Sequence, residues 1–225
     1  MELHLLSTPG PGDDIRWVVE ACRPYLRQHG DDSTLAYLPL GSLYAEKWLE
    51  PTEKAFRGLA RIALINTETQ ELQEMEGILR RATVVYVPGG NTFLLNHRMH
   101  VSGLTPYLRK KIQAGLPLVA FGAGTVLCGP NILTSRDLNM VATTHFEGLR
   151  LTPFNFHVHY SGDGAADNWL ADYRSFHDNP VILLEDGASL KIDGKTVRLA
   201  RGPACCWRAG QEKERLSDGK TVLVN

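Results

Sequence analysis

The chain has 225 residues, of which 43% are hydrophobic and 22% are charged, and its formal net charge is −1. This length and composition are ordinary for one globular α/β domain with a sizeable core. The balanced charge argues against a nucleic-acid partner or an anionic membrane surface, because no global field draws the chain to a polyanion. We expect no membrane span, since no run of about 18 apolar residues occurs. We expect no signal peptide either, since residues 1–6 lack a basic segment and a long apolar one.

The cysteines and histidines give little reason to expect a metal. The four cysteines, at positions 22, 128, 205 and 206, show neither a CxxC pair nor zinc-ligand spacing. With no export signal, they predict reduced thiols in a cytoplasmic protein. His157 and His159 face the same side of an extended segment, which suits two metal ligands, but the sequence offers no clear third. We therefore expect no metal and no other cofactor.

In chain order, short apolar runs alternate with amphipathic segments over the first half of the chain. Strands are expected over residues 2–8, 34–40, 61–66, 83–88 and 117–121. Helices are expected between them, over residues 13–28, 42–59, 69–81, 91–100 and 104–114. Strands that are apolar throughout and alternate with helices predict a parallel sheet covered on both faces.

The last third of the chain has a different pattern. Residues 149–160 alternate as an extended segment does, and residues 163–177 are expected to form a helix. Short strands are expected over residues 181–184, 189–192 and 196–200, with a hairpin signal at Asp193-Gly194-Lys195. Because no linker, low-complexity segment or internal repeat divides the sequence, we expect residues 1–225 to form a single domain.

A first glycine-rich turn follows the strand over residues 83–88. Consecutive glycines, Gly89 and Gly90, let the backbone approach a ligand and present N–H groups, as an oxyanion hole requires. Asn91 can cap the helix that follows. In parallel sheets ligands bind at the carboxyl ends of strands, where this turn lies. The alternative is a tight strand-to-helix turn that binds nothing.

A second glycine-rich turn has the outline of a nucleophile elbow. Residues 117–124 read Pro-Leu-Val-Ala-Phe-Gly-Ala-Gly, an apolar strand that runs into a sharp turn and a helix. The elbow pattern is Gly-x-Ser-x-Gly, with the nucleophile at its centre. Gly122 occupies that centre and has no side-chain oxygen to be acylated. Ala123 can still donate its amide to an oxyanion; the alternative is a turn that only packs a helix on a strand.

Four segments together resemble the peptidase E family of serine hydrolases, also called aspartyl dipeptidases. These segments are residues 1–8, 88–93, 121–132 and 153–160, and their order and spacing fit the family over most of the chain. The resemblance implies a class I glutamine amidotransferase-like fold. This is a three-layer α/β/α architecture with a mainly parallel central sheet, to which the C-terminal strands add antiparallel hairpins.

The resemblance also implies a role for individual residues. The family's nucleophilic serine falls on Gly122 and its histidine base on His159. The carboxylate that orients the histidine falls on Asp137 or, as in some members, near Glu185 and Asp186. The residues implied for the oxyanion hole and for substrate binding are Gly89, Gly90, Asn91, Ala123 and His157.

Two departures from the family pattern bear on activity. The serine is replaced by Gly122, and Thr125, Cys128 and Ser135 are the nearby candidates for a displaced nucleophile. Family members also carry an arginine after the histidine that is thought to hold the substrate's N-terminal aspartate. Here no arginine follows until Arg174, so a preference for aspartyl peptides does not carry over.

The sequence therefore predicts a scaffold for hydrolysing short peptides that is inactive or strongly impaired. One alternative is a pseudo-peptidase that binds a small peptide or an amino-acid-like ligand. A second is a hydrolase that uses activated water or a displaced nucleophile. In a third, Gly122 is a recent or engineered substitution, which the presence of both His159 and Asp137 favours. The sequence is compatible with a monomer and with a homodimer.

Overall fold

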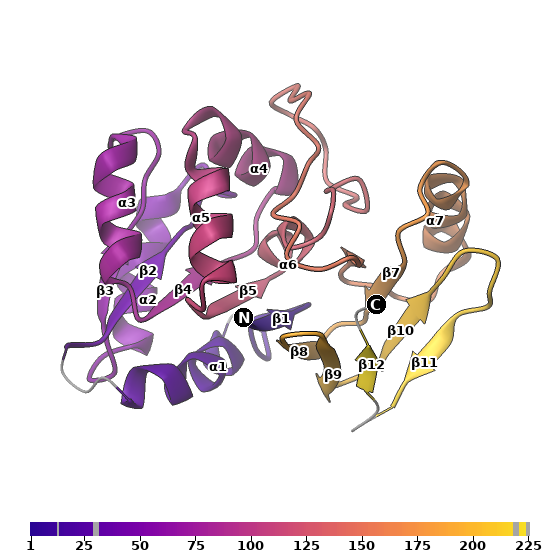
Figure 1. Ribbon diagram of the computed structural model, residues 1–225, viewed down its shortest axis with the longest axis horizontal. Helices are drawn as coiled ribbons and strands as arrows, with labels where there is room; N and C mark the ends of the chain where they lie inside the picture. The colour runs from indigo at the N-terminus through magenta and orange to yellow at the C-terminus, as the bar shows by residue number, and fades with distance from the viewer. Residues whose placement is uncertain (13, 29–31, 218–220, 224–225) are drawn as a thin grey trace.

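The first half of the chain alternates strands and helices, as its sequence predicts (Figure 1). The computed structural model describes residues 1–12, 14–28, 32–217 and 221–223. Its elements up to residue 127 are β1 (Glu2–Leu6), α1 (Arg16–Arg27), β2 (Thr34–Tyr37), the 3₁₀ helix η2 (Ala45–Trp48), α2 (Leu49–Ala55), β3 (Arg61–Leu64), α3 (Leu72–Arg81), β4 (Val84–Val87), α4 (Thr92–Val101), α5 (Leu104–Gln113), β5 (Leu118–Phe121) and α6 (Ala123–Leu127).

The central sheet is mainly parallel, which confirms the predicted fold class. Strands β1, β5, β4, β2 and β3 pair in parallel in that spatial order. On the other side of β1 the sheet continues in antiparallel fashion with β8 (Ser189–Asp193), β9 (Thr196–Arg201) and β12 (Thr221–Leu223). Strands β8 and β9 form the hairpin expected at Asp193-Gly194-Lys195.

Helices cover both faces of the parallel strands, because successive residues of a buried strand point to opposite faces. In β5, Leu118 and Ala120 pack in the cluster that α3, α4, α5 and α6 build on one face. Val119, between them, packs in the cluster that α1 builds on the other face. The three-layer arrangement that the family resemblance implied is therefore present. Among the described residues, no helix is long and apolar enough to cross a bilayer.

A second, smaller sheet was not predicted. It has the order β11 (Glu214–Leu216), β10 (Ala204–Trp207), β7 (Val181–Leu184) and β6 (Asn155–His157). Helix α7 (Gly164–Phe176) connects β6 to β7 and lies beside this sheet (Figure 1). The sequence predicts one extended segment over residues 149–160, but within it only residues 155–157 pair as a strand, in parallel with β7.

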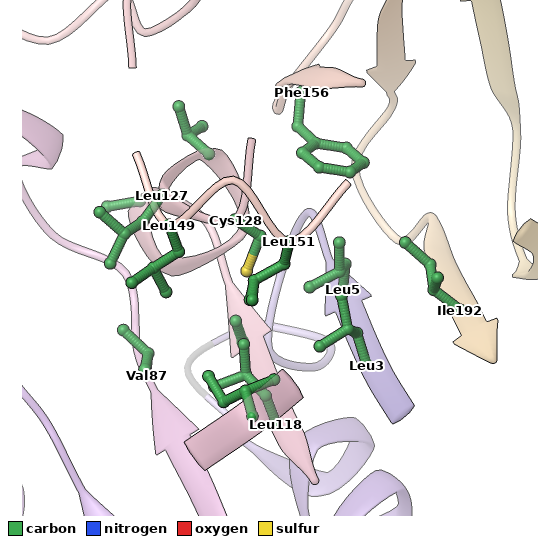
Figure 2. Close-up of a cluster of buried hydrophobic side chains, with 14 of the residues drawn as sticks. Leu3, Leu5, Val87, Leu118, Leu127, Cys128, Leu149, Leu151, Phe156 and Ile192 are labelled. Atoms are coloured by element: carbon green, nitrogen blue, oxygen red, sulfur yellow. The ribbon is translucent and has the colours of Figure 1, made fainter. Parts of the chain in front are cut away.

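The long connection from α6 to β6 is fixed to the main core by apolar side chains. Leu149 and Leu151 of this connection lie in the same buried cluster as Leu5 of β1 and Phe156 of β6. Figure 2 shows these side chains gathered around the end of α6, with Cys128 among them. Burial of each such side chain contributes about 1.5–3 kcal/mol. The cluster therefore holds β6 in place against the parallel sheet.

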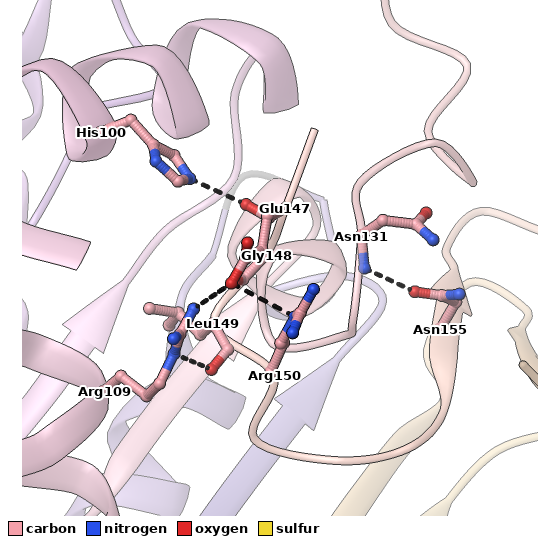
Figure 3. Close-up of polar contacts among 8 residues, drawn as sticks. All are labelled: His100, Arg109, Asn131, Glu147, Gly148, Leu149, Arg150 and Asn155. Atoms are coloured by element: carbon pink, nitrogen blue, oxygen red, sulfur yellow. Dashed lines mark hydrogen bonds and ion pairs between the residues drawn. The ribbon is translucent and has the colours of Figure 1, made fainter. Parts of the chain in front are cut away.

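Polar contacts fix the same connection from its outer side (Figure 3). The Arg109 guanidinium donates to the Glu147 carboxylate at 2.8 Å and to the Leu149 carbonyl at 2.8 Å. The ring of His100 donates to the Glu147 carbonyl at 2.9 Å. Near β6, the Asn155 side chain accepts the backbone N–H of Asn131 at 3.0 Å. These contacts explain how a chain without regular secondary structure keeps a definite path.

We predict that replacing Gly124 by alanine destabilises the fold. Gly124 lies in α6, where a Cβ atom would stand 2.3 Å from the backbone oxygen of Val87. Because backbone has to move to relieve that contact, Gly124→Ala should lower the free energy of unfolding by about 1–3 kcal/mol. Gly164→Ala is the matched control, since a Cβ there meets nothing within 4 Å. Urea unfolding followed by circular dichroism measures both. Equal stability of Gly124→Ala and the native chain would contradict the packing described.

Candidate active site

A cavity of about 340 Å³ opens where β4 and β5 end. Its walls come from the turn after β4, the turn after β5, residues 134–137 and residues 157–159. The first two are the glycine-rich turns that the sequence singled out. The other two belong to the long connection and to β6, which the core and polar contacts hold against the sheet. The fold thus brings both turns and the candidate histidines to one cavity, at the sheet edge where ligands bind in such folds.

Gly122 forms a sharp, strained turn between β5 and α6. Its φ is 55° and its ψ is −121°, a backbone conformation that side chains rarely adopt. The Gly122 N–H donates to the Leu6 carbonyl at 3.1 Å, and its carbonyl accepts the N–H of Thr125 at 2.9 Å. A Cβ at this position would meet only the Cα of Gly89, at 3.3 Å. The turn therefore has the geometry of a nucleophile elbow and nearly enough room for a side chain.

Two backbone N–H groups beside Gly122 are free to bind an oxyanion. Ala123 is the first residue of α6, so its N–H precedes the hydrogen bonds within the helix. Gly90 has a φ of 125°, and a Cβ there would stand 2.5 Å from the Gly41 carbonyl oxygen. Neither N–H has a hydrogen-bond partner within the described part of the chain. Both residues line the cavity, as an oxyanion hole requires.

Gly89 and Asn91 support this turn. A Cβ at Gly89 would stand 2.6 Å from the ring of Phe121, so only glycine fits without a shift of that ring. The Asn91 side chain accepts the N–H of Leu94 at 2.9 Å, which confirms the predicted cap of α4, and donates to the Leu138 carbonyl at 2.9 Å. Asn91 does not line the cavity. In this structure Asn91 therefore holds the turn and the neighbouring loop, and the substrate contact that the resemblance implied stays a prediction.

Asp137 contacts the start of α4. Its Oδ2 accepts hydrogen bonds from the backbone N–H and the hydroxyl of Thr92, at 2.7 and 2.6 Å, and from the Ser135 hydroxyl at 3.0 Å. A carboxylate is stabilised at a helix N-terminus by the helix dipole and by the free N–H groups there. The prediction that Asp137 orients His159 is therefore wrong for this geometry. Asp137 lines the cavity, but its contacts join the 134–137 segment to α4.

The carboxylate that contacts His159 is Asp186. His159 Nδ1 lies 2.6 Å from Asp186 Oδ1, and the His159 backbone N–H donates to the Ser7 hydroxyl at 2.9 Å. In the neutral ring, a proton on Nδ1 is the one that can be donated to this carboxylate, and that tautomer has the lone pair on Nε2 that a general base needs. The sequence placed the alternative carboxylate near residues 185–186. The structure assigns the contact to Asp186. Within the described part of the chain Glu185 forms backbone bonds, from its N–H to the Pro203 carbonyl and from the Ala188 N–H to its own carbonyl, and its side chain has no contact with His159.

The side chains of His157 and His159 lie in different environments. This differs from the expectation that both face the same side of an extended segment. Strand β6 ends at His157, and His159 has a φ of 56°. The His157 side chain is buried and donates from Nδ1 to the Thr134 carbonyl at 2.9 Å, whereas the His159 side chain is 55% exposed. Burial lowers the pKa of His157, so it is neutral at pH 7, with Nε2 as an acceptor. No group of three potential metal ligands occurs among the described residues.

The candidates for a displaced nucleophile are engaged elsewhere. Thr125 is buried, and its hydroxyl donates to the Leu6 carbonyl at 2.8 Å. Cys128 is buried in the core (Figure 2), where burial raises the pKa of its thiol and so suppresses the thiolate. Neither lines the cavity. Ser135 does, but its hydroxyl donates to the Asp137 carboxylate.

The strained turn, the two free amides and His159 thus line one cavity of a class I glutamine amidotransferase-like fold. The model of peptidase family S51 matches residues 16–200, so the chain belongs to peptidase family S51.

Curated relatives and solved structures agree with this assignment. Peptidase E of Shewanella denitrificans is 30% identical over 151 residues, and the probable alpha-aspartyl dipeptidase of Drosophila melanogaster is 32% identical over 154 residues. Each alignment covers 64% of this chain and 64% of the relative. A putative peptidase E from Listeria monocytogenes EGD-e superposes with a TM-score of 0.71 at 23% identity, covering 89% of this chain and 98% of that one. A peptidase from an acI-B1 actinobacterium superposes with a TM-score of 0.75 at 14% sequence identity. That superposition covers 99% of this chain and 96% of the other.

Two residues at the site were not predicted from the sequence. Ser7 follows β1, and its hydroxyl accepts the N–H of His159 only because the second sheet returns to the end of β1. Arg136 lines the cavity from the long connection. No local pattern marks either residue, since a serine after a strand and an arginine beside an aspartate are common in any sequence.

We predict that the two candidate carboxylates differ in their effect on stability. Asp137→Ala leaves the buried Thr92 N–H without its acceptor and should lower the free energy of unfolding by about 1–3 kcal/mol. Asp186→Ala removes only the exposed ion pair with His159, so we expect the free energy of unfolding to change by no more than about 0.5 kcal/mol. Urea unfolding at pH 7 measures both. A larger loss for Asp186→Ala than for Asp137→Ala would contradict the assigned contacts.

Proposed function

We propose that this chain binds short peptides in the cavity at Gly122 and, as a pseudo-peptidase, does not form an acyl-enzyme. The observation that carries the proposal is Gly122 itself. It keeps the backbone of a nucleophile elbow but lacks the oxygen that would attack a peptide carbonyl. The oxyanion amides and the His159–Asp186 pair remain beside it. Membership of peptidase family S51 supports a short peptide as the ligand.

The remaining groups explain what a restored hydroxyl would do. On a serine at position 122, the hydroxyl proton would pass to His159 Nε2 as the oxygen bonds to the peptide carbonyl carbon. The carbonyl electrons would move to its oxygen, which the N–H groups of Gly90 and Ala123 would stabilise. The peptide C–N bond would then break as His159 returns the proton to the leaving amine. Without the hydroxyl, the first of these steps has no nucleophile on the protein.

A second function, slow hydrolysis by water, is favoured by the intact His159–Asp186 pair. Gly122 leaves its side of the turn open, and His159 can act as base for a water that attacks the carbonyl directly. Enzymes stripped of their triad keep roughly 10³–10⁴-fold acceleration over water from the oxyanion hole and binding alone. A slow turnover by the native chain that His159→Ala lowers further would support this function.

We predict that Gly122→Ser restores peptidase activity. Because the proposed base and the proposed oxyanion amides line the same cavity as Gly122, kcat/KM for short peptides should rise by about 10³-fold or more over the native chain. Gly122→Ala is the matched control: it imposes the same backbone strain, about 1–3 kcal/mol, without a hydroxyl, and should stay inactive. Release of free amino acids from a dipeptide panel is the measurement.

Two outcomes of this comparison would count against the proposal. A folded Gly122→Ser variant that shows no gain over Gly122→Ala on any peptide would mean that the site is not otherwise complete. A native chain whose melting temperature does not rise with any dipeptide at millimolar concentration would show that it does not bind these ligands.

We predict that Asp186, not Glu185, supports His159 in catalysis. In the Gly122→Ser background, Asp186→Asn should lower kcat by on the order of 10²-fold or more, because the histidine loses the partner that fixes its tautomer. Glu185→Gln, one residue away and without a contact to His159, serves as the control and should leave kcat close to that of the parent. Steady-state kinetics measures both, and a larger loss in the Glu185→Gln variant would contradict the assignment.

A further inference from the structure

Ser7 places a buried hydroxyl at the end of β1, next to the backbone of the candidate histidine. Its side chain is fully buried and does not line the cavity. The hydroxyl accepts the backbone N–H of His159 at 2.9 Å and donates to the carbonyl of Leu184, the last residue of β7, at 3.3 Å. The same Leu184 carbonyl accepts the N–H of Tyr160 at 3.0 Å. The backbone on both sides of the His159 Cα atom is therefore fixed by Ser7 and by the carbonyl to which Ser7 donates.

This fixation is needed because His159 has an unfavourable backbone conformation. Its φ is 56°, a value that residues other than glycine rarely adopt. Such a conformation persists only where the surrounding structure enforces it, and it is found most often at functional sites. The His159 side chain is 55% exposed, so packing does little to hold the ring. The direction of the ring therefore depends on the backbone, which the hydrogen bond to Ser7 holds.

Thr8 makes the corresponding contact on the side of the carboxylate. Its hydroxyl accepts the backbone N–H of Gly187 at 3.0 Å. Gly187 follows Asp186 in a turn and has a φ of 82°. The Asp186 side chain is 70% exposed, so its position too depends on the backbone that carries it. Two adjacent hydroxyls thus hold the two segments that carry the His159–Asp186 pair.

Leu6, directly before these residues, holds the third part of the site. Its carbonyl accepts the N–H of Gly122 at 3.1 Å and the hydroxyl of Thr125 at 2.8 Å. Residues 6–8 therefore carry, in order, the contacts to the strained turn, to the histidine and to the turn of its carboxylate. One short segment at the end of β1 thus sets how these parts lie relative to one another.

We propose that Ser7 and Thr8 are positioning residues for the base. Their hydroxyls hold His159 and Asp186 in the geometry that keeps Nδ1 bonded to the carboxylate and leaves Nε2 for proton transfer. The inference rests on the proposed function, in which His159 is the base. Because neither Ser7 nor Thr8 lines the cavity, neither is expected to touch the ligand. Loss of the Ser7 hydroxyl should therefore lower kcat and leave KM nearly unchanged.

The tautomer of His159 tests the proposal in the native chain, without any activity. A histidine's tautomer is set by the hydrogen bond that its other nitrogen makes, and the ring nitrogen chemical shifts report it. In the native chain the neutral ring should carry its proton mainly on Nδ1. In Ser7→Ala and in Thr8→Val, the form protonated on Nε2 should increase to a comparable share, because the ring no longer keeps its contact with Asp186.

Two results of this measurement would overturn the proposal. One is a native ring that carries its proton mainly on Nε2. The other is a tautomer ratio that stays at the native value in both Ser7→Ala and Thr8→Val. A change in only one variant would confine the positioning role to that residue.

Ser33→Ala is the matched control for the loss of a buried hydroxyl. Ser33 is fully buried, and its hydroxyl donates at 2.6 Å to the carbonyl of Leu26 in α1, outside the cavity wall. This variant should leave the His159 tautomer as in the native chain. Thr8→Ser keeps the hydroxyl that Thr8→Val removes, and it should retain the native ratio. If Ser7→Ala does not fold, the two Thr8 variants decide the outcome.

Kinetics in the Gly122→Ser background separates this proposal from the proposed function. There Ser7→Ala should lower kcat by about 10- to 100-fold and change KM by less than about twofold, because a misdirected base slows proton transfer without a change in binding. Ser33→Ala should leave both constants unchanged. An equal kcat with and without Ser7→Ala would contradict the positioning role, although the proposed function would stand. If Gly122→Ser itself is inactive, the proposed function fails, and the tautomer ratio still decides whether Ser7 and Thr8 hold the histidine.

Discussion

The site depends on the backbone turn at Gly122, which the hydrogen bond from its N–H to the Leu6 carbonyl fixes against the end of β1. At φ 55° and ψ −121° the chain reverses sharply enough for α6 to begin at the next residue and to present the Ala123 N–H to the cavity. The turn after β4 lies against it, so that a Cβ at Gly122 would meet Gly89. This arrangement needs no side chain at position 122, because it is built from backbone atoms and from the packing of two neighbouring parallel strands.

Features set by local sequence could be predicted, and those set by long-range pairing could not. The two glycine turns and the Asn91 cap follow from strand-to-helix transitions within a few residues, and the structure has all three. The carboxylate that contacts His159 depends on the path of the chain after α7. No local pattern around Asp137 or Asp186 predicts which of the two lies beside the histidine. The alternation argument for His157 and His159 failed because it assumes an extended backbone, whereas the positive φ at His159 turns the chain.

The distribution of charge around the cavity separates structural groups from groups left for a ligand. Asp137 is occupied at the start of α4, and Asp186 is occupied by His159. The groups on the cavity wall that have no partner within the described part of the chain are mainly hydrogen-bond donors. They are the backbone N–H groups of Gly90 and Ala123 and the guanidinium of Arg136. Backbone amides of this kind suit a ligand with a carbonyl oxygen, as the proposed short peptide has.

The central claim is that the site lacks only the nucleophilic oxygen, and covalent labelling tests it most directly. A fluorophosphonate reacts by far the fastest with a hydroxyl that a base activates beside an oxyanion hole. Intact-mass spectrometry of the Gly122→Ser variant should show one adduct, mapped to position 122, whereas the native chain and Gly122→Ala should show none. An adduct on another side chain of the native chain, or a folded Gly122→Ser variant that stays unlabelled, would contradict the account.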